Sequence, residues 1–261
     1  RVALLSLAVL AAAAPLAAQV TVINAGKLVD TEKGTVASNQ MIIVRDGEAG
    51  EGGPWRAVAA GARVLALSKI AALAGRSDSH PHVADGGLPE DNGDPRAVPF
   101  PPSSEIALAA IPSVKSRLMA GFTTVRDVGT YRALNDVALR DAIARGDIPG
   151  PRMYVAGAYI TITGGAGAMT GVSPDVILPW DMKFGEANSP VEVRQKVRLL
   201  VAPGVNVIKV LARGAVPPPD RTQNSQAVTP AEPSDAVAGA PPCRPQRRHP
   251  APPPTRHQPT D

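Results

Sequence analysis

Residues 118–129 read LMAGFTTVRDVG, and this stretch joins the end of one element to the start of the next. Upstream of it, apolar residues recur at helical spacing, and Ser104 is placed to cap that helix. Gly121 ends the helix, and the β-branched and aromatic residues 122–125 that follow are typical of a strand. The stretch therefore predicts a helix that leads directly into a strand.

The same alternation continues downstream. It predicts a second helix from Leu134 to Gly146, a strand at 153–155, a third helix opened by a capping box at 189–192, and a buried strand at 205–211. Strands that alternate with helices over short connections favour parallel βαβ units, and so an α/β fold. Residues 75–216 would hold about four such units, half of an eight-stranded (β/α)8 barrel. An open doubly wound sheet fits the same periodicity.

Residues 19–74 have a different pattern, in which short strands replace the alternation. Strands are expected at 20–23, 40–44 and 63–67, with a turn signal at Asp46-Gly47. The glycine-rich and alanine-rich stretch after that turn has no clear period.

The first eighteen residues have the features of an export signal. Arg1 precedes an uninterrupted apolar core from Val2 to Ala14, and small residues stand before Gln19. This core is shorter than the roughly 20 apolar residues that span a bilayer. We therefore expect an exported protein, periplasmic or secreted, and not an integral membrane protein. No initiator methionine precedes Arg1, so we expect the sequence to be truncated at its front.

Residues 217–261 form a proline-rich tail with no Leu, Ile, Met, Phe, Trp or Tyr. Such a segment lacks the apolar surface needed to offset the entropy of ordering, so we expect disorder. A frameshifted or degraded end explains this composition better than a proline-rich docking segment. The only cysteine, Cys243, lies in this tail, which excludes an internal disulfide and a cysteine-based zinc site.

The overall charge excludes one class of partner. The net charge is +4, but aromatic residues are only 3% and no long Lys/Arg run occurs before the tail. Nucleic-acid binding needs a basic stripe or stacking aromatics, so we expect no nucleic-acid partner.

His80-Pro81-His82 is the strongest chemical signal in the chain. Side chains alternate along a strand, so histidines two residues apart at a strand end point to the same face. Two converging imidazoles can bind a divalent metal, most commonly zinc. The alternative is a chance pair in a polar loop.

These motifs together resemble the metal-dependent amidohydrolase superfamily, in its imidazolonepropionase-like and Xaa-Pro-dipeptidase-like branch. The matching segments run in family order and are Val44–Gly47, Asp78–His82, Ala120–Gly129, Gly150–Arg152, Gly164-Gly165 and Val207–Val210. The resemblance implies a small β-sandwich over residues 19–74, beside a (β/α)8 barrel with metal at the carboxyl ends of its strands.

The resemblance also implies roles for three residues. His80 and His82 match the first pair of metal ligands, and Lys209 matches a lysine that is carboxylated in many members and bridges two ions. One or two zinc ions are therefore expected, activating water to hydrolyse a C–N bond of a small amide, cyclic amide or Xaa-Pro dipeptide. Burying Lys209 as a cation within 205–211 would be expensive, which also favours carboxylation. A lysine extending from a strand end towards solvent is the alternative.

Part of the family's ligand set has no counterpart in the sequence. The family takes two further histidines from strands five and six and an aspartate from strand eight. The only other histidines here, His249 and His257, lie in the tail, so the catalytic residues stay unassigned. Two hypotheses follow: a metal-dependent amidohydrolase in a truncated or frameshifted copy, or a catalytically inactive fragment that at most binds metal. The sequence leaves the oligomeric state open.

Overall fold

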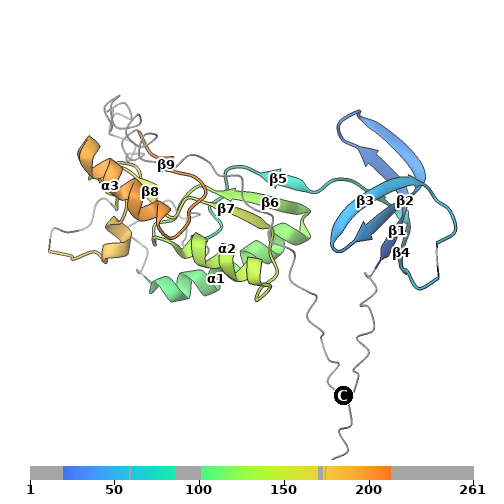
Figure 1. The fold of residues 1–261 in the computed structure, drawn as a ribbon. Helices are drawn as coiled ribbons and strands as arrows, with labels where there is room; N and C mark the ends of the chain where they lie inside the picture. The colour runs from blue at the N-terminus through green and yellow to red at the C-terminus, as the bar shows by residue number, and fades with distance from the viewer. Residues whose placement is uncertain (1–19, 59, 86–100, 170–172, 174, 213–261) are drawn as a thin grey trace, which may run out of the picture. The chain divides into compact units, whose positions relative to one another are not determined.

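The computed structural model describes residues 20–58, 60–85, 101–169, 173 and 175–212 (Figure 1). The chain divides into two compact units, with the boundary between Ala74 and Gly75. The predicted export signal and the whole of the proline-rich tail fall outside the described residues. Among the helices that are described, none has the length and apolar character needed to cross a membrane.

Unit 1 is a four-stranded sheet in the order β3-β2-β1-β4. Its strands are β1 (Thr21–Asp30), β2 (Thr35–Arg45), β3 (Glu48–Pro54) and β4 (Arg63–Ala72). β1 pairs antiparallel with β2 and parallel with β4. The turn predicted at Asp46-Gly47 joins β2 to β3, and both residues have positive φ (51° and 78°), as a tight hairpin turn requires.

β3 was not predicted from the sequence. Its residues, EAGEGGP, show no apolar alternation, and all but one of them are exposed. The strand pairs with β2 through its backbone. Hydrogen bonds between backbones do not require any pattern of side chains. The glycine-rich stretch therefore gave no sequence signal for a strand. The buried core of this unit is formed by Val22, Met41 and Ile43.

The first half of unit 2 is a parallel sheet in the order β5-β6-β7, with strands β5 (Arg76–Asp78), β6 (Phe122–Asp127) and β7 (Arg152–Val155). Helices α1 (Ser103–Met119) and α2 (Asn135–Arg145) connect these strands and lie together against the sheet (Figure 1). Its core includes Val83, Ala110, Val114, Val125, Met153 and Val155. This is the predicted parallel α/β arrangement.

The second half contains β8 (Tyr159–Ile160), the short helix η3 (Trp180–Lys183), α3 (Pro190–Val201) and β9 (Lys209–Val210). β8 and β9 pair in parallel. The serine cap of α3 is confirmed, because the Ser189 side chain accepts a hydrogen bond from the Glu192 N–H. The Glu192 carboxylate accepts the N–H of Asn188, one residue before the cap. The apolar face of α3 is buried, as its spacing predicts, and is formed by Val193, Val197 and Leu200.

The strand predicted at 205–211 is shorter than expected. Only Lys209–Val210 form a ladder, although the N–H groups of Asn206 and Val207 both donate to the Val155 carbonyl. Two donors on one carbonyl interrupt the regular register. The segment thus lies beside the end of β7 as well as beside β8, without being one continuous strand.

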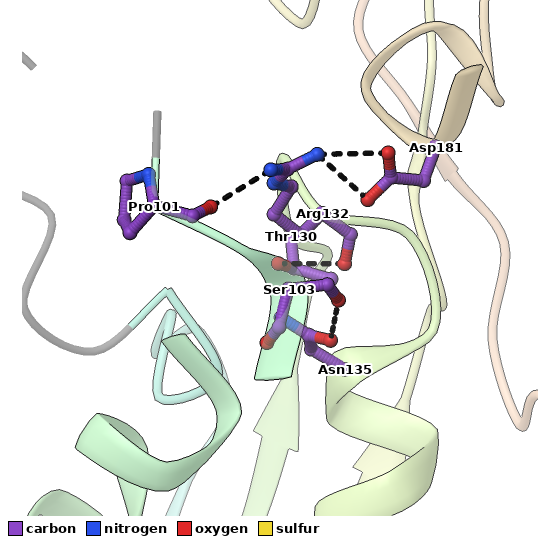
Figure 2. Close-up of polar contacts among 6 residues, drawn as sticks. All are labelled: Pro101, Ser103, Thr130, Arg132, Asn135 and Asp181. Atoms are coloured by element: carbon purple, nitrogen blue, oxygen red, sulfur yellow. Dashed lines mark hydrogen bonds and ion pairs between the residues drawn. The ribbon is translucent and has the colours of Figure 1, made fainter. Parts of the chain in front are cut away.

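The N-terminus of α1 corrects a second expectation. Its N-cap is Pro102 and not Ser104, and no side chain caps it. The neighbouring Ser103 hydroxyl donates instead to Asn135 Oδ1 at 2.6 Å (Figure 2). Arg132 extends the same contact network, pairing with Asp181 at 2.8 Å and donating to the Pro101 carbonyl at 2.7 Å. These bonds tie the loop after β6 to the start of α1 and to η3.

Candidate metal centre

His80 and His82 lie in the loop after β5, not on the strand itself. β5 ends at Asp78, whose carboxylate accepts the His80 N–H at 3.2 Å and pairs with Arg117 at 3.1 Å. The two imidazole centroids are 5.7 Å apart, with planes at 71°. The prediction that strand alternation aligns the two imidazoles is therefore wrong. The two rings are brought close together by a loop whose backbone is held by Asp78.

Lys209 lies beside this loop, although it is far from it in sequence. It is the first residue of β9, and its Nζ lies 3.5 Å from Nε2 of His80, 129 positions away in sequence. Lys209 is only partly buried, so full burial of its charge gives no reason for carboxylation. Its charge is the largest influence that lowers the pKa of His80. His80 is thereby biased towards the neutral imidazole, which is the form that binds metal.

Asp127 binds the backbone of the loop after β5 that carries His80 and His82, called the histidine loop below. It is fully buried at the end of β6, and its Oδ2 accepts the N–H groups of Val83 (2.9 Å) and Ala84 (3.0 Å). Its Oδ1 accepts the N–H of Gly129 at 3.2 Å. Burial is the main cause that raises the pKa of Asp127, to about 8, against the effect of these hydrogen bonds.

Arg126, the neighbour of Asp127 in sequence, contacts the same loop at a different point. Arg126 Nε donates to the Ser79 carbonyl at 2.8 Å, on the outside of the loop. Successive strand residues point to opposite faces, so neighbours in sequence cannot pair across the strand. Arg126 therefore binds the loop at Ser79, and Asp127 binds it at Val83 and Ala84.

The ring orientation of His82 is set by the loop after β6. Its Nδ1 lies 3.0 Å from the Gly129 carbonyl oxygen and 2.9 Å from the Tyr159 hydroxyl. A carbonyl can only accept, so Nδ1 carries the hydrogen and Nε2 keeps a lone pair for a metal. Gly129 has a φ of 120°, and a Cβ there would lie 2.8 Å from the Tyr159 ring. Glycine is required at this position for both reasons.

Asp85 lies behind His82 and was not singled out from sequence. It is 4% exposed and accepts hydrogen bonds from the Tyr131 N–H (3.0 Å), the Tyr159 hydroxyl (3.2 Å) and the Thr130 hydroxyl. Burial raises the pKa of Asp85 to about 6. Its position three residues after His82 was the only available signal, because its partners come from the loop after β6 and from β8.

Only some of the side chains gathered here are of the kind that binds a divalent metal. Imidazole nitrogens from His80 and His82 are typical zinc ligands, whereas a lysine ligates only after it is converted to a carbamate. Within the described residues, no three histidine, cysteine or carboxylate side chains gather closely enough to hold an ion. The described part of the chain thus provides two imidazoles and Lys209.

The comparison with protein families decides the assignment. A family profile described as "Amidohydrolase family" matches residues 71–232, more than half of the chain. The chain belongs to the amidohydrolase family. No curated protein matches it closely enough to count as a relative.

Solved structures are similar to this amidohydrolase over 85% of its length. A Xaa-Pro dipeptidase with methionine in its active site is 27% identical with a TM-score of 0.73, and the match covers 54% of that chain. A structure described as an amidohydrolase is 26% identical with a TM-score of 0.68, covering 53% of its chain. A prolidase complexed with N-methylphosphonate-L-proline is 22% identical with a TM-score of 0.68 and 53% coverage, and supports the fold alone. The chain spans about half the length of these relatives.

Proposed function

We propose that this amidohydrolase hydrolyses the C–N bond of a small amide, cyclic amide or Xaa-Pro dipeptide in a metal-dependent reaction. The observation that carries the proposal is the approach of Lys209 Nζ to within 3.5 Å of His80 Nε2, beside His82. Family membership supports the reaction class, and the Xaa-Pro dipeptidase at 27% identity supports the dipeptide substrate.

We also propose that residues 75–216 form the first four units of a (β/α)8 barrel, with part of a β-sandwich in residues 19–74. The parallel order of β5, β6 and β7 and the parallel β8-β9 pair support this arrangement. The carboxyl ends of the strands in such a barrel carry the active site. The loop that holds His80 and His82 follows the carboxyl end of β5, where this arrangement requires it.

In this proposal His80 and His82 would hold a divalent metal, with zinc favoured. The amine of Lys209 would take up CO2 and lose a proton to form a carbamate, which would contribute an oxygen ligand. A metal at such a site activates water and polarises the scissile carbonyl. The protein's own part is to present the ligands. Asp78 and Asp127 hold the loop backbone, and the Gly129 carbonyl keeps His82 Nε2 free.

Metal binding without turnover is the second candidate. It is supported by the described ligand set, which has two imidazoles and Lys209 but no carboxylate placed among them to transfer a proton to the leaving nitrogen. This candidate predicts that zinc binds and that no amide is cleaved.

A turnover assay separates the two candidates. The zinc-loaded chain is incubated with a panel of Xaa-Pro dipeptides and small cyclic amides, with and without a chelator. Chelator-sensitive release of proline or ring-opened product is expected, and it should vanish in the His80→Ala/His82→Ala variant but not in the His249→Ala/His257→Ala variant. Stoichiometric zinc with no product from any substrate would favour the binding-only candidate.

Export to the periplasm or outside the cell is a further proposal, supported by the pattern of residues 1–18. N-terminal sequencing of the protein from cells that express it should find a start at Gln19. A start at Arg1 would contradict export with cleavage at this site.

A further inference from the structure

Tyr159 bridges His82 to a buried carboxylate. Its hydroxyl oxygen lies 2.9 Å from His82 Nδ1 and 3.2 Å from Asp85 Oδ2. The three residues come from separate places in the fold: His82 and Asp85 from the loop after β5, and Tyr159 from β8. Tyr159 and Asp85 are both buried, at 7% and 4% exposure.

The surrounding groups determine the direction of the hydrogens along this bridge. Asp85 Oδ1 already accepts from the Tyr131 N–H and the Thr130 hydroxyl, so Oδ2 is the oxygen left for Tyr159. The tyrosine hydrogen therefore goes to Asp85, and the tyrosine oxygen is left to accept. The only hydrogen available to it from His82 is the one on Nδ1, which also faces the Gly129 carbonyl at 3.0 Å.

We propose that Tyr159 is a positioning residue that couples Asp85 to His82, holding the imidazole as the Nδ1–H tautomer with Nε2 directed to the metal site. The assignment of His82 as a ligand rests on the proposed function, but the tautomer does not. Carboxylate partners behind a ligating histidine fix ring orientation and raise ligand basicity. Here the carboxylate acts through a phenol in place of direct contact.

The packing around Tyr159 keeps its hydroxyl at this point. The Tyr131 ring stands edge-on at 5.2 Å, and Gly129 and Gly167 leave no room for a side chain against the Tyr159 ring and its Cβ. Burial also raises the pKa of Tyr159, which keeps the phenol protonated as a donor. A phenylalanine at this position would fill the same space and remove only the bridge.

The direct test is the tautomer of His82 in the metal-free wild-type chain. Long-range ¹H–¹⁵N spectra of the imidazoles, recorded at about pH 9 so that histidines are neutral, distinguish the two tautomers. We expect His82 to be in the Nδ1–H form. The Nε2–H form in the wild type would overturn the proposal, whatever the variants or the activity assays show.

Two variants test the contribution of Tyr159 itself. Tyr159→Phe should add a visible population of the Nε2–H tautomer and weaken zinc binding by about 10-fold or more, measured by competition with a chromophoric chelator. Tyr154→Phe is the matched control, because that tyrosine is 37% exposed on β7 and should leave both readouts unchanged. Circular dichroism confirms that each variant is folded.

The outcomes separate this inference from the proposed function. An unchanged tautomer and zinc affinity in folded Tyr159→Phe would show that the Gly129 carbonyl suffices alone, and would overturn the inference. A changed tautomer with no zinc binding in any form would leave the positioning role intact and contradict the metal site. If Tyr159→Phe does not fold, Asp85→Asn tests the same bridge by removing the carboxylate that accepts the tyrosine hydrogen. An unchanged His82 tautomer and zinc affinity in folded Asp85→Asn would overturn the inference.

Discussion

At the residue scale, Asp127 is a buried carboxylate that holds the backbone around the candidate metal site and is not itself a candidate ligand. Its two oxygens accept three backbone N–H groups, two from the histidine loop and one from the loop after β6. Without it, Val83 and Ala84 would leave buried donors unpaired. An unpaired buried donor costs about 1–3 kcal/mol. Asp127 therefore couples the position of His82 to the end of β6.

Removing this carboxylate should destabilise the whole unit. Asp127→Ala is expected to lower the free energy of unfolding by about 3 kcal/mol, measured by urea denaturation of the metal-free chain. Asp147→Ala is the matched control, because its ion pair with Arg145 is exposed and should contribute less than about 0.5 kcal/mol. Equal effects of the two substitutions would contradict the bracing role of Asp127.

The pKa of Asp85 predicts a pH dependence of stability. Burial raises this pKa from 3.8 in the unfolded chain to about 6 in the folded one. Between these values the folded chain keeps a proton that the unfolded chain has lost, so the free energy of unfolding falls as pH rises from about 4 to about 6. The difference between these two pKa values, about 2, corresponds to a fall of about 3 kcal/mol.

Asp85→Asn should remove this part of the fall, because asparagine does not titrate. Asp127 titrates in the same direction up to about pH 8 and remains in both proteins. The charge of Asp85 also raises the pKa of Asp127, so the difference between wild type and variant reports Asp85 together with its effect on Asp127. Urea midpoints from pH 4 to pH 9 provide the measurement. Parallel curves for the two proteins would contradict the raised pKa.

At the element scale, the sequence predicted those elements whose side chains carry the signal. α3 has a capping serine, a first-turn proline and an apolar face at helical spacing, and all three appear in the structure. β3 and the segment 205–211 were missed or overextended, because backbone pairing and a shared carbonyl determine them. No residue pattern reports such bonds.

The two helix starts predict effects of different size on the free energy of unfolding for similar substitutions. Ser189→Ala removes the side-chain cap of α3 and should cost about 1 kcal/mol of unfolding free energy. Ser104→Ala removes an exposed hydroxyl that caps nothing, and should change stability by less than about 0.5 kcal/mol. Thermal or urea denaturation of both variants checks this. A larger loss in Ser104→Ala would restore the sequence-based expectation for α1.

At the scale of the whole molecule, family motifs located the candidate site better than local patterns did. His80, His82 and Lys209 were predicted from motifs far apart in sequence, and the fold brings Lys209 to His80. The residues that hold them, Asp85 and Tyr159, were missed. Their roles come from contacts between segments far apart in sequence, and neither lies in a recognisable motif. Prediction therefore reached the candidate ligands, whose binding of metal stays a prediction, and not the residues that support them.

The central claim is that His80 and His82 bind one metal ion beside Lys209. Zinc bound per chain and its X-ray absorption spectrum should be measured for the wild type, for His80→Ala/His82→Ala and for His249→Ala/His257→Ala. The account predicts imidazole ligands in the wild type, loss of zinc in the first variant and no change in the second, which removes the same number of imidazoles. Zinc retained equally by His80→Ala/His82→Ala would contradict it.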